Sequence, residues 1–129
     1  MKTETDEKTK SHLKPIITNW LSGIRLAWQG NTVFRGMVSI SIVGIVLALV
    51  ARIGMLKVSL LLALACIAFG LEIANTCIET LCDIVHPGQS AKVKIVKDAF
   101  SAVPIFTYTA YVVSWLILVA PAIWKWIAR

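Results

Sequence analysis

The sequence predicts an all-α integral membrane protein, in which three transmembrane helices follow an N-terminal amphipathic helix that lies at the membrane interface. Three observations predict this class: 57% of the 129 residues are hydrophobic, only 16% are charged, and the mean hydropathy is +0.77. Ordinary soluble domains have roughly 45–50% apolar and about 25% charged residues. The composition therefore excludes a soluble globular domain, and its many apolar residues also exclude a disordered chain.

The N-terminal segment divides into a polar tail and an amphipathic helix. Residues 1–14 have almost no apolar side chains, which predicts a mobile cytoplasmic tail. Over residues 15–29, Trp20, Trp28 and five other apolar side chains share one helical face. This stripe is typical of a helix in the membrane interface, with the tryptophans as anchors. A helix packed on a soluble core is the alternative, but the rest of the chain provides no such core.

Three apolar stretches are long enough to cross a bilayer, which takes about 20 helical residues. They run from about residue 33 to 51, from 58 to 85 and from 100 to 124. The purely apolar part of the second stretch ends at Leu71, so this crossing must continue through polar residues. We find no internal repeat, and residues 15–129 are predicted to form a single membrane-embedded domain.

The third stretch contains Pro104 and Pro121, which predict a kink or a frayed turn. The segment before it, residues 88–98, is predicted to be a loop and contains three lysines. Three crossings offer a single chain little surface to pack against. The sequence therefore predicts an oligomer.

The basic residues predict the orientation in the membrane. Nine of the thirteen Lys and Arg side chains fall before the first crossing or between the second and third, and four fall on the other side. Because cytoplasmic loops are enriched in Lys and Arg, the N-terminus is predicted to be cytoplasmic and the C-terminus external. The basic residues form no nucleic-acid-binding pattern, so nucleic acid is excluded as a partner. The three cysteines lie in apolar stretches and are interpreted as reduced packing residues.

Four polar side chains share one face of the second crossing. Glu72, Asn75, Glu79 and Asp83 fall within an arc of about 80° on a helical wheel. A carboxylate near the bilayer centre costs about 2.5–3.5 kcal/mol, so these groups must face protein or water. A hydrogen-bonded seam between helices would explain Asn75 alone. Three carboxylates on one stripe indicate a functional site instead.

Several kinds of chemistry suit this stripe. Carboxylates one or two turns apart can share a divalent cation, or one can bind a metal while another accepts a proton. Lys97 and Asp98 add a cation and a carboxylate at the cytoplasmic edge, a mixture that suits a phosphate-bearing substrate. A proton or cation pathway and an assembly seam are open alternatives. The sequence contains none of the motifs of soluble kinases, P-loop enzymes or serine hydrolases.

The run E-I-A-N-T-C-I-E-T-L-C-D (residues 72–83), followed fourteen residues later by Lys97-Asp98, resembles the small prokaryotic diacylglycerol kinase family, which includes the undecaprenol kinases. The resemblance extends over roughly residues 15–120 and includes G-I-R-L-A-W (residues 23–28). It implies a kinase that uses ATP and Mg²⁺ to phosphorylate the hydroxyl of a membrane lipid in the bacterial inner membrane. It also implies a homotrimer with sites between the subunits, near the cytoplasmic surface.

The resemblance further implies a role for each matching residue. Glu72 corresponds to the general base that accepts the proton of the lipid hydroxyl. Glu79 corresponds to a magnesium ligand, and Asn75 to a neighbour of the metal or of the γ-phosphate. Lys97 would contact the ATP phosphates, and Asp98 would orient the nucleotide. These roles agree with phosphoryl transfer, in which the protein positions the partners and offsets their charge.

The chain departs from the family pattern at several positions. Asn31 stands where an acidic second metal ligand is usual; its amide oxygen can still bind magnesium but without the charge, so we expect a weaker metal affinity. Met37 replaces a further acid, Ser90 a frequent histidine, His12 an arginine, and Phe100 a small residue. Three readings follow: a diacylglycerol kinase first, an undecaprenol kinase second, and a catalytically inactive protein that binds lipid or nucleotide third.

Overall fold

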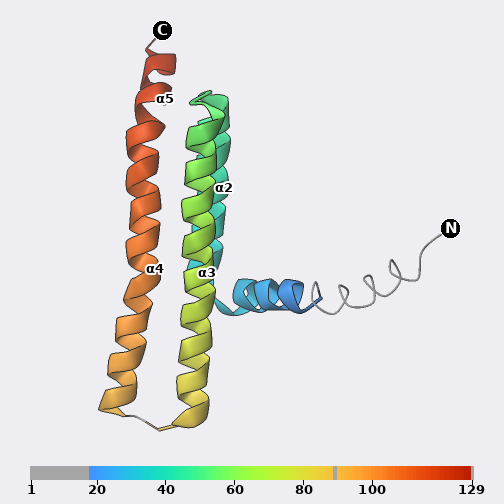
Figure 1. Ribbon diagram of the computed structural model, residues 1–129, viewed down its shortest axis with the longest axis vertical. Coiled ribbons are helices and arrows are strands. Elements are labelled where there is room, and N and C mark those ends of the chain that lie inside the picture. Colours follow the sequence, from blue (N-terminus) through green and yellow to red (C-terminus); the bar gives the residue numbers. More distant parts are fainter. Residues whose placement is uncertain (1–17, 89, 129) are drawn as a thin grey trace, which may run out of the picture. The chain divides into compact units, whose positions relative to one another are not determined.

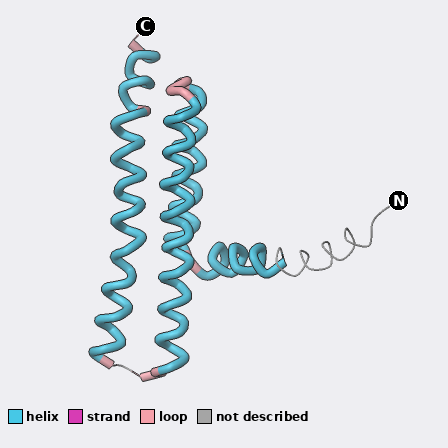
Figure 2. The backbone as a smooth tube through the Cα atoms, viewed as in Figure 1, coloured by secondary structure: helices cyan, strands magenta, loops and turns pink. Residues whose placement is uncertain are grey.

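The computed structural model describes residues 18–88 and 90–128 and divides the chain into two units, residues 1–32 and 33–129. The described residues are helical apart from short turns and contain no strand (Figure 2). The predicted tail, residues 1–14, lies outside the described residues. The structure therefore confirms the all-α class.

The first unit contains the N-terminal helix. Residues 18–30 are helical, and the Asn31 N–H closes the last turn by donating to the Ala27 carbonyl oxygen at 3.0 Å. Trp20 and Trp28 are exposed on this helix. Its position at the membrane interface stays a prediction.

The second unit contains four helices: α2 (Thr32–Val50, which begins at the last residue of the first unit), α3 (Met55–Val85), α4 (Ala91–Leu118) and α5 (Ala120–Ile127), as labelled in Figure 1. Three segments are long and apolar enough to cross a membrane: α2, α3 and the combined stretch Ala91–Ile127. This finding confirms three helices of spanning length and composition.

The third spanning helix begins earlier than predicted. Residues 91–98 form the first turns of α4 and are not part of a loop, so the predicted loop is wrong for these residues. Ser90 has an extended backbone, and the Lys94 N–H donates to its carbonyl oxygen at 3.0 Å, as at a helix start. No glycine or proline follows until Pro104, which α4 accommodates in its interior. The helix ends at Leu118, close to Pro121, whose missing N–H suits the first turn of α5.

Helices α3 and α4 pack against each other, and a core of buried side chains lies toward the α5 end. Leu61 and Ala65 of α3, Tyr111 of α4 and Val119 are all 2% exposed or less. The side chains at 61, 65 and 68 recur at helical spacing, so they form one face of α3. This packing sets the register between α3 and α4, and therefore sets which polar side chains can meet near residues 83–98.

Helix α2 is attached to α4 by side-chain hydrogen bonds. Three donors on α4 reach carbonyl oxygens of α2 at 2.8–3.3 Å: Tyr108 reaches Met37, Tyr111 reaches Ser41, and Trp115 reaches Gly44. A helical carbonyl has a second lone pair that can accept such a bond. A Cβ atom at Gly44 would lie 2.6 Å from Tyr111 Oη, so the close approach requires glycine at this position.

A four-residue turn connects α2 to α3. The Ile53 N–H donates to the Ala48 carbonyl oxygen at 3.4 Å, and the Arg52 N–H donates to that of Leu49 at 3.1 Å. This pair of bonds is the Schellman arrangement, in which the residue after the helix cap adopts a left-handed conformation. Arg52 occupies that position with φ 52°. The turn thus places an arginine where glycine is usual.

Candidate functional site

Two polar residues of the predicted stripe are buried within the single chain. Glu72 and Asn75 of α3 are each 5% exposed. Their separation by three residues puts them on the same helical face, as the sequence predicted. The Thr76 hydroxyl donates to the Glu72 carbonyl oxygen at 3.1 Å. A carboxylate withdrawn from lipid in this way is the type of group that membrane proteins retain for function.

Asn75 is oriented by Glu79. Its Nδ2 donates to Glu79 Oε1 at 3.1 Å, across one helical turn. The other amide atom, Asn75 Oδ1, is buried and has no hydrogen-bond partner among the described residues. Nearly all buried polar atoms in proteins are paired, so this oxygen is available to accept a hydrogen bond from a ligand or to coordinate a cation.

Glu72 lines a groove formed by α2, α3 and α4. The groove has a volume of about 320 Å³, and its walls include Gly36 and Met37 of α2 and Pro104 and Tyr108 of α4. Most of its other lining residues are apolar. Met37, which stands where the family often has an acid, therefore contributes an apolar wall. The groove combines one buried carboxylate with a surface suited to hydrocarbon.

A second hollow lies where α3 meets α4, and an ion pair contributes to its wall. Lys97 Nζ contacts Asp83 Oδ1 at 2.5 Å, joining the last turns of α3 to the first turns of α4. Asp98, Lys94 and Ser90 also line this hollow, which has a volume of about 750 Å³. It is the more polar of the two, with cationic and anionic groups side by side.

The sequence did not predict the ion pair between Asp83 and Lys97. The sequence showed Asp83 one turn beyond Glu79, and Lys97 after a short connection that follows the same helix. A lysine on the first turns of the following antiparallel helix is the signal that could have suggested the contact. The error in the loop prediction concealed it, because a lysine in a loop has no defined helical face.

The structure places the predicted site residues at two hollows, with Glu72 in the wall of the first and Lys97 and Asp98 in the wall of the second. Glu72, Asn75 and Glu79 follow each other along α3, and Lys97 and Asp98 lie on α4 at the second hollow. Asn31 belongs to the first unit. Its part in the site stays a prediction.

The oxygen atoms of the site suit a magnesium ion that arrives with phosphate. Among the described residues, no three His, Cys, Asp or Glu side chains are clustered as a metal-binding group. Glu79 and the unpaired Asn75 Oδ1 still offer two oxygen atoms on neighbouring turns. Magnesium commonly takes one or two carboxylates from the protein and its other ligands from water and substrate phosphates. The donor set therefore fits a nucleotide-bound ion better than a closed protein cage.

Three helices of spanning length and composition, with a carboxylate buried between them, fit a multi-pass membrane protein with a polar group inside its bundle. The sequence matches the family model described as prokaryotic diacylglycerol kinase over residues 19–119. The chain belongs to this family, which confirms the resemblance drawn from its motif. Searches of curated proteins and of solved structures gave no match. Family membership suggests a lipid kinase and fits a multi-pass bacterial membrane protein.

Proposed function

We propose that the protein transfers the γ-phosphoryl group of ATP to the hydroxyl of a membrane lipid, with diacylglycerol as the first candidate acceptor. The observation that carries this proposal is Glu72, 5% exposed, in the wall of a mostly apolar groove. The groove suits the hydrocarbon part of a lipid, and a carboxylate there can accept the proton of a hydroxyl. Glu72 is thus proposed as the general base.

The polar hollow is proposed to receive the nucleotide. Lys97 would offset the charge of the phosphates, and Asp98 would orient the nucleotide beside it. Glu79 and Asn75 would hold Mg²⁺, with Asn31 as a further ligand. When bound, the ion would neutralise charge on the transferred group. In this proposal Lys97 and Asp98 position the nucleotide, and Glu72 accepts the proton of the lipid hydroxyl.

The order of residues along α3 supports a reaction centre between the two hollows. Asp83 lies eleven positions after Glu72, which corresponds to about 16 Å along a helix axis. Asn75 and Glu79 fall within that interval. A lipid hydroxyl presented at Glu72 and a phosphate chain reaching past Lys97 would therefore meet near these two residues.

The assembly and location complete the proposal. We take the protein to be a homotrimer in the bacterial inner membrane, with its N-terminal helix in the interface and its N-terminus cytoplasmic. Large apolar side chains such as Ile40, Leu62 and Ile117 are exposed on the single chain. Lipid or neighbouring subunits would cover them. Asp83, whose side chain is 69% exposed, is open to a contribution from another subunit.

Two other functions have specific support. The apolar wall at Met37 would equally accept undecaprenol, whose hydroxyl carries a long hydrocarbon chain. Asn31, Met37 and Ser90 together favour a member of the family that binds lipid or nucleotide without turnover. The buried Glu72 and the paired Lys97 argue against an inactive protein, because they are the proposed base and the proposed phosphate-binding cation that transfer requires.

One assay separates these functions. Purified protein in mixed micelles is given labelled ATP, magnesium and, in turn, diacylglycerol, ceramide or undecaprenol, with Glu72→Gln as the control. We expect label in one lipid, and its loss in the variant. Transfer to no lipid by folded, assembled protein would contradict the kinase and favour the inactive reading.

A further inference from the structure

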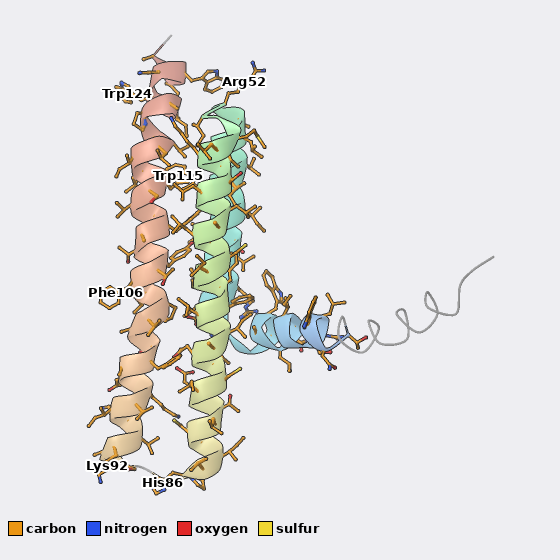
Figure 3. All side chains as sticks on the ribbon, in the orientation of Figure 1. Arg52, His86, Lys92, Phe106, Trp115 and Trp124 are labelled. Carbon is orange, nitrogen blue, oxygen red and sulfur yellow. The ribbon has the colours of Figure 1, made fainter. Side chains whose placement is uncertain are left out.

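We call the region of Glu72, Glu79, Asp83 and Asp98 the acidic site. A third hollow lies at the opposite end of the second unit. It lies between the α2–α3 turn and α5, has a volume of about 590 Å³, and is lined by Arg52, Lys125, Trp126 and small apolar side chains. We call it the far hollow. Arg52 and Trp124 mark this end in Figure 3, and His86 and Lys92 mark the opposite end.

The far hollow contains two cationic side chains that no described acidic side chain neutralises. The four acidic side chains among the described residues all lie between residues 72 and 98. Neither Arg52 nor Lys125 has an ion pair or a side-chain hydrogen bond with any residue that the structure describes. A neighbouring cation, Lys57 in the first turn of α3, lies outside the lining of this hollow. No residue that the structure describes therefore supplies a counter-charge to Arg52 or Lys125.

The backbone at Arg52 argues for a role of its side chain. Arg52 has φ 52° in the left-handed position of the Schellman turn, where glycine is preferred because it has no Cβ. An arginine there costs free energy relative to glycine. Residues that retain such strain are concentrated at ligand-binding and other functional positions.

The surroundings identify the class of ligand. The far hollow lies where spanning helices end, and α5 exposes Trp124 and Trp126, a residue type that gathers at the head-group level of membranes. A guanidinium group can donate two parallel hydrogen bonds to the oxygens of one phosphate, and a lysine adds a point charge. We propose that the far hollow binds the phosphate of an anionic phospholipid head group in the leaflet opposite the acidic site. This proposal depends on the membrane-spanning fold and is independent of the kinase activity.

Native mass spectrometry of the protein in a neutral detergent tests the proposal. Phosphatidylglycerol and phosphatidylcholine with identical acyl chains are compared for wild type, Arg52→Gly, Lys125→Gln and the control Lys57→Gln. Both lipids carry the phosphodiester, but the quaternary ammonium of phosphatidylcholine would be repelled by Arg52 and Lys125, so we expect wild type to retain phosphatidylglycerol preferentially. Each of the first two variants should weaken that retention by about fivefold or more, as for loss of a charged hydrogen bond, and the control should match wild type.

Arg52→Gly also guards against loss of folding as the cause. Because glycine relieves the left-handed backbone, this variant should keep or raise the thermal midpoint in neutral detergent while it loses the lipid. Equal retention of both lipids by wild type, or an equal loss in Lys57→Gln, would overturn the proposal. Displacement of phosphatidylglycerol by millimolar inorganic phosphate would assign the hollow to free phosphate and overturn the lipid assignment.

Discussion

The two ends of the second unit use charge in opposite ways. At the acidic end, Lys97 pairs with Asp83 across two helices, and Asn75 is tied to Glu79 within one. At the far end, Arg52 and Lys125 line a hollow to whose wall none of the described acidic side chains belongs. The difference teaches that internal pairing fixes the positions of polar side chains at one end, where the nucleotide is proposed to bind. Cations that have no partner among the described residues are free to bind the anionic lipid proposed for the far end.

The two ends also differ in how deeply their polar side chains are buried. Glu72 and Asn75 are buried in the bundle, where a low local dielectric strengthens each electrostatic interaction. Arg52 is exposed at its turn. Changes at the buried residues of the acidic end should therefore affect phosphoryl transfer strongly, and changes at the far end should affect lipid retention.

The largest expected effect comes from Glu72→Gln. This change keeps the shape of the side chain and removes the proposed base, so transfer to lipid should fall by about 10²- to 10⁴-fold. Initial rates with labelled ATP measure it, and Lys57→Gln, on the same helix at the far end, should stay near wild type. An undiminished rate in Glu72→Gln would show that Glu72 is not the base, and the two ends would then not differ in their effect on transfer.

The middle of the bundle connects the ends, and Gly44→Ala tests that connection. The added Cβ would lie 2.6 Å from Tyr111 Oη and 3.0 Å from Trp115 Nε1. We expect a loss of about 1–3 kcal/mol in stability, as for overpacking. Thermal unfolding in detergent measures this loss. Gly70→Ala is the matched control, because its Cβ would meet nothing within 4 Å; equal destabilisation by both would contradict the role of the close approach.

Asn31→Glu tests the prediction that Asn31 stands in the place of an acidic magnesium ligand. A carboxylate at this position adds charge to a proposed magnesium ligand, so the magnesium concentration that gives half-maximal activity should fall severalfold. A magnesium titration of transfer measures the change. Asn31→Gln, which lengthens the side chain without adding charge, should not reproduce it. An unchanged titration in Asn31→Glu would exclude Asn31 as a ligand.

Asp83→Asn should have the smallest effect. The Asp83 side chain is 69% exposed, and exposed ion pairs contribute little. Losing the pair should free Lys97 to sample other rotamers and raise the KM for MgATP by about two- to fivefold, with kcat nearly unchanged. Asp83→Glu should restore most of the affinity. A fall in kcat with constant KM would show that Asp83 acts in the transfer step.

The helical period allowed much of the acidic end to be predicted. Residues spaced by three, four and four along one helix must share a face, so Glu72, Asn75, Glu79 and Asp83 could be grouped from the sequence. The start of α4 could not be found in this way. Lys92, Lys94 and Lys97 lowered the local hydropathy and suggested a loop, although the backbone is helical from Ala91. Hydropathy indicates where a membrane can be crossed, and a helix can begin before that apolar stretch.

The sequence by itself determined the class, the three spanning segments, the acidic stripe and the family, because composition and local spacing are properties of one stretch of chain. Only the tertiary structure decided that Lys97 meets Asp83, that Glu72 lines a groove with Met37, and that Arg52 and Lys125 share the far hollow. These contacts depend on the register between helices. That register is set by packing such as Gly44 against Tyr111, which no single helix encodes.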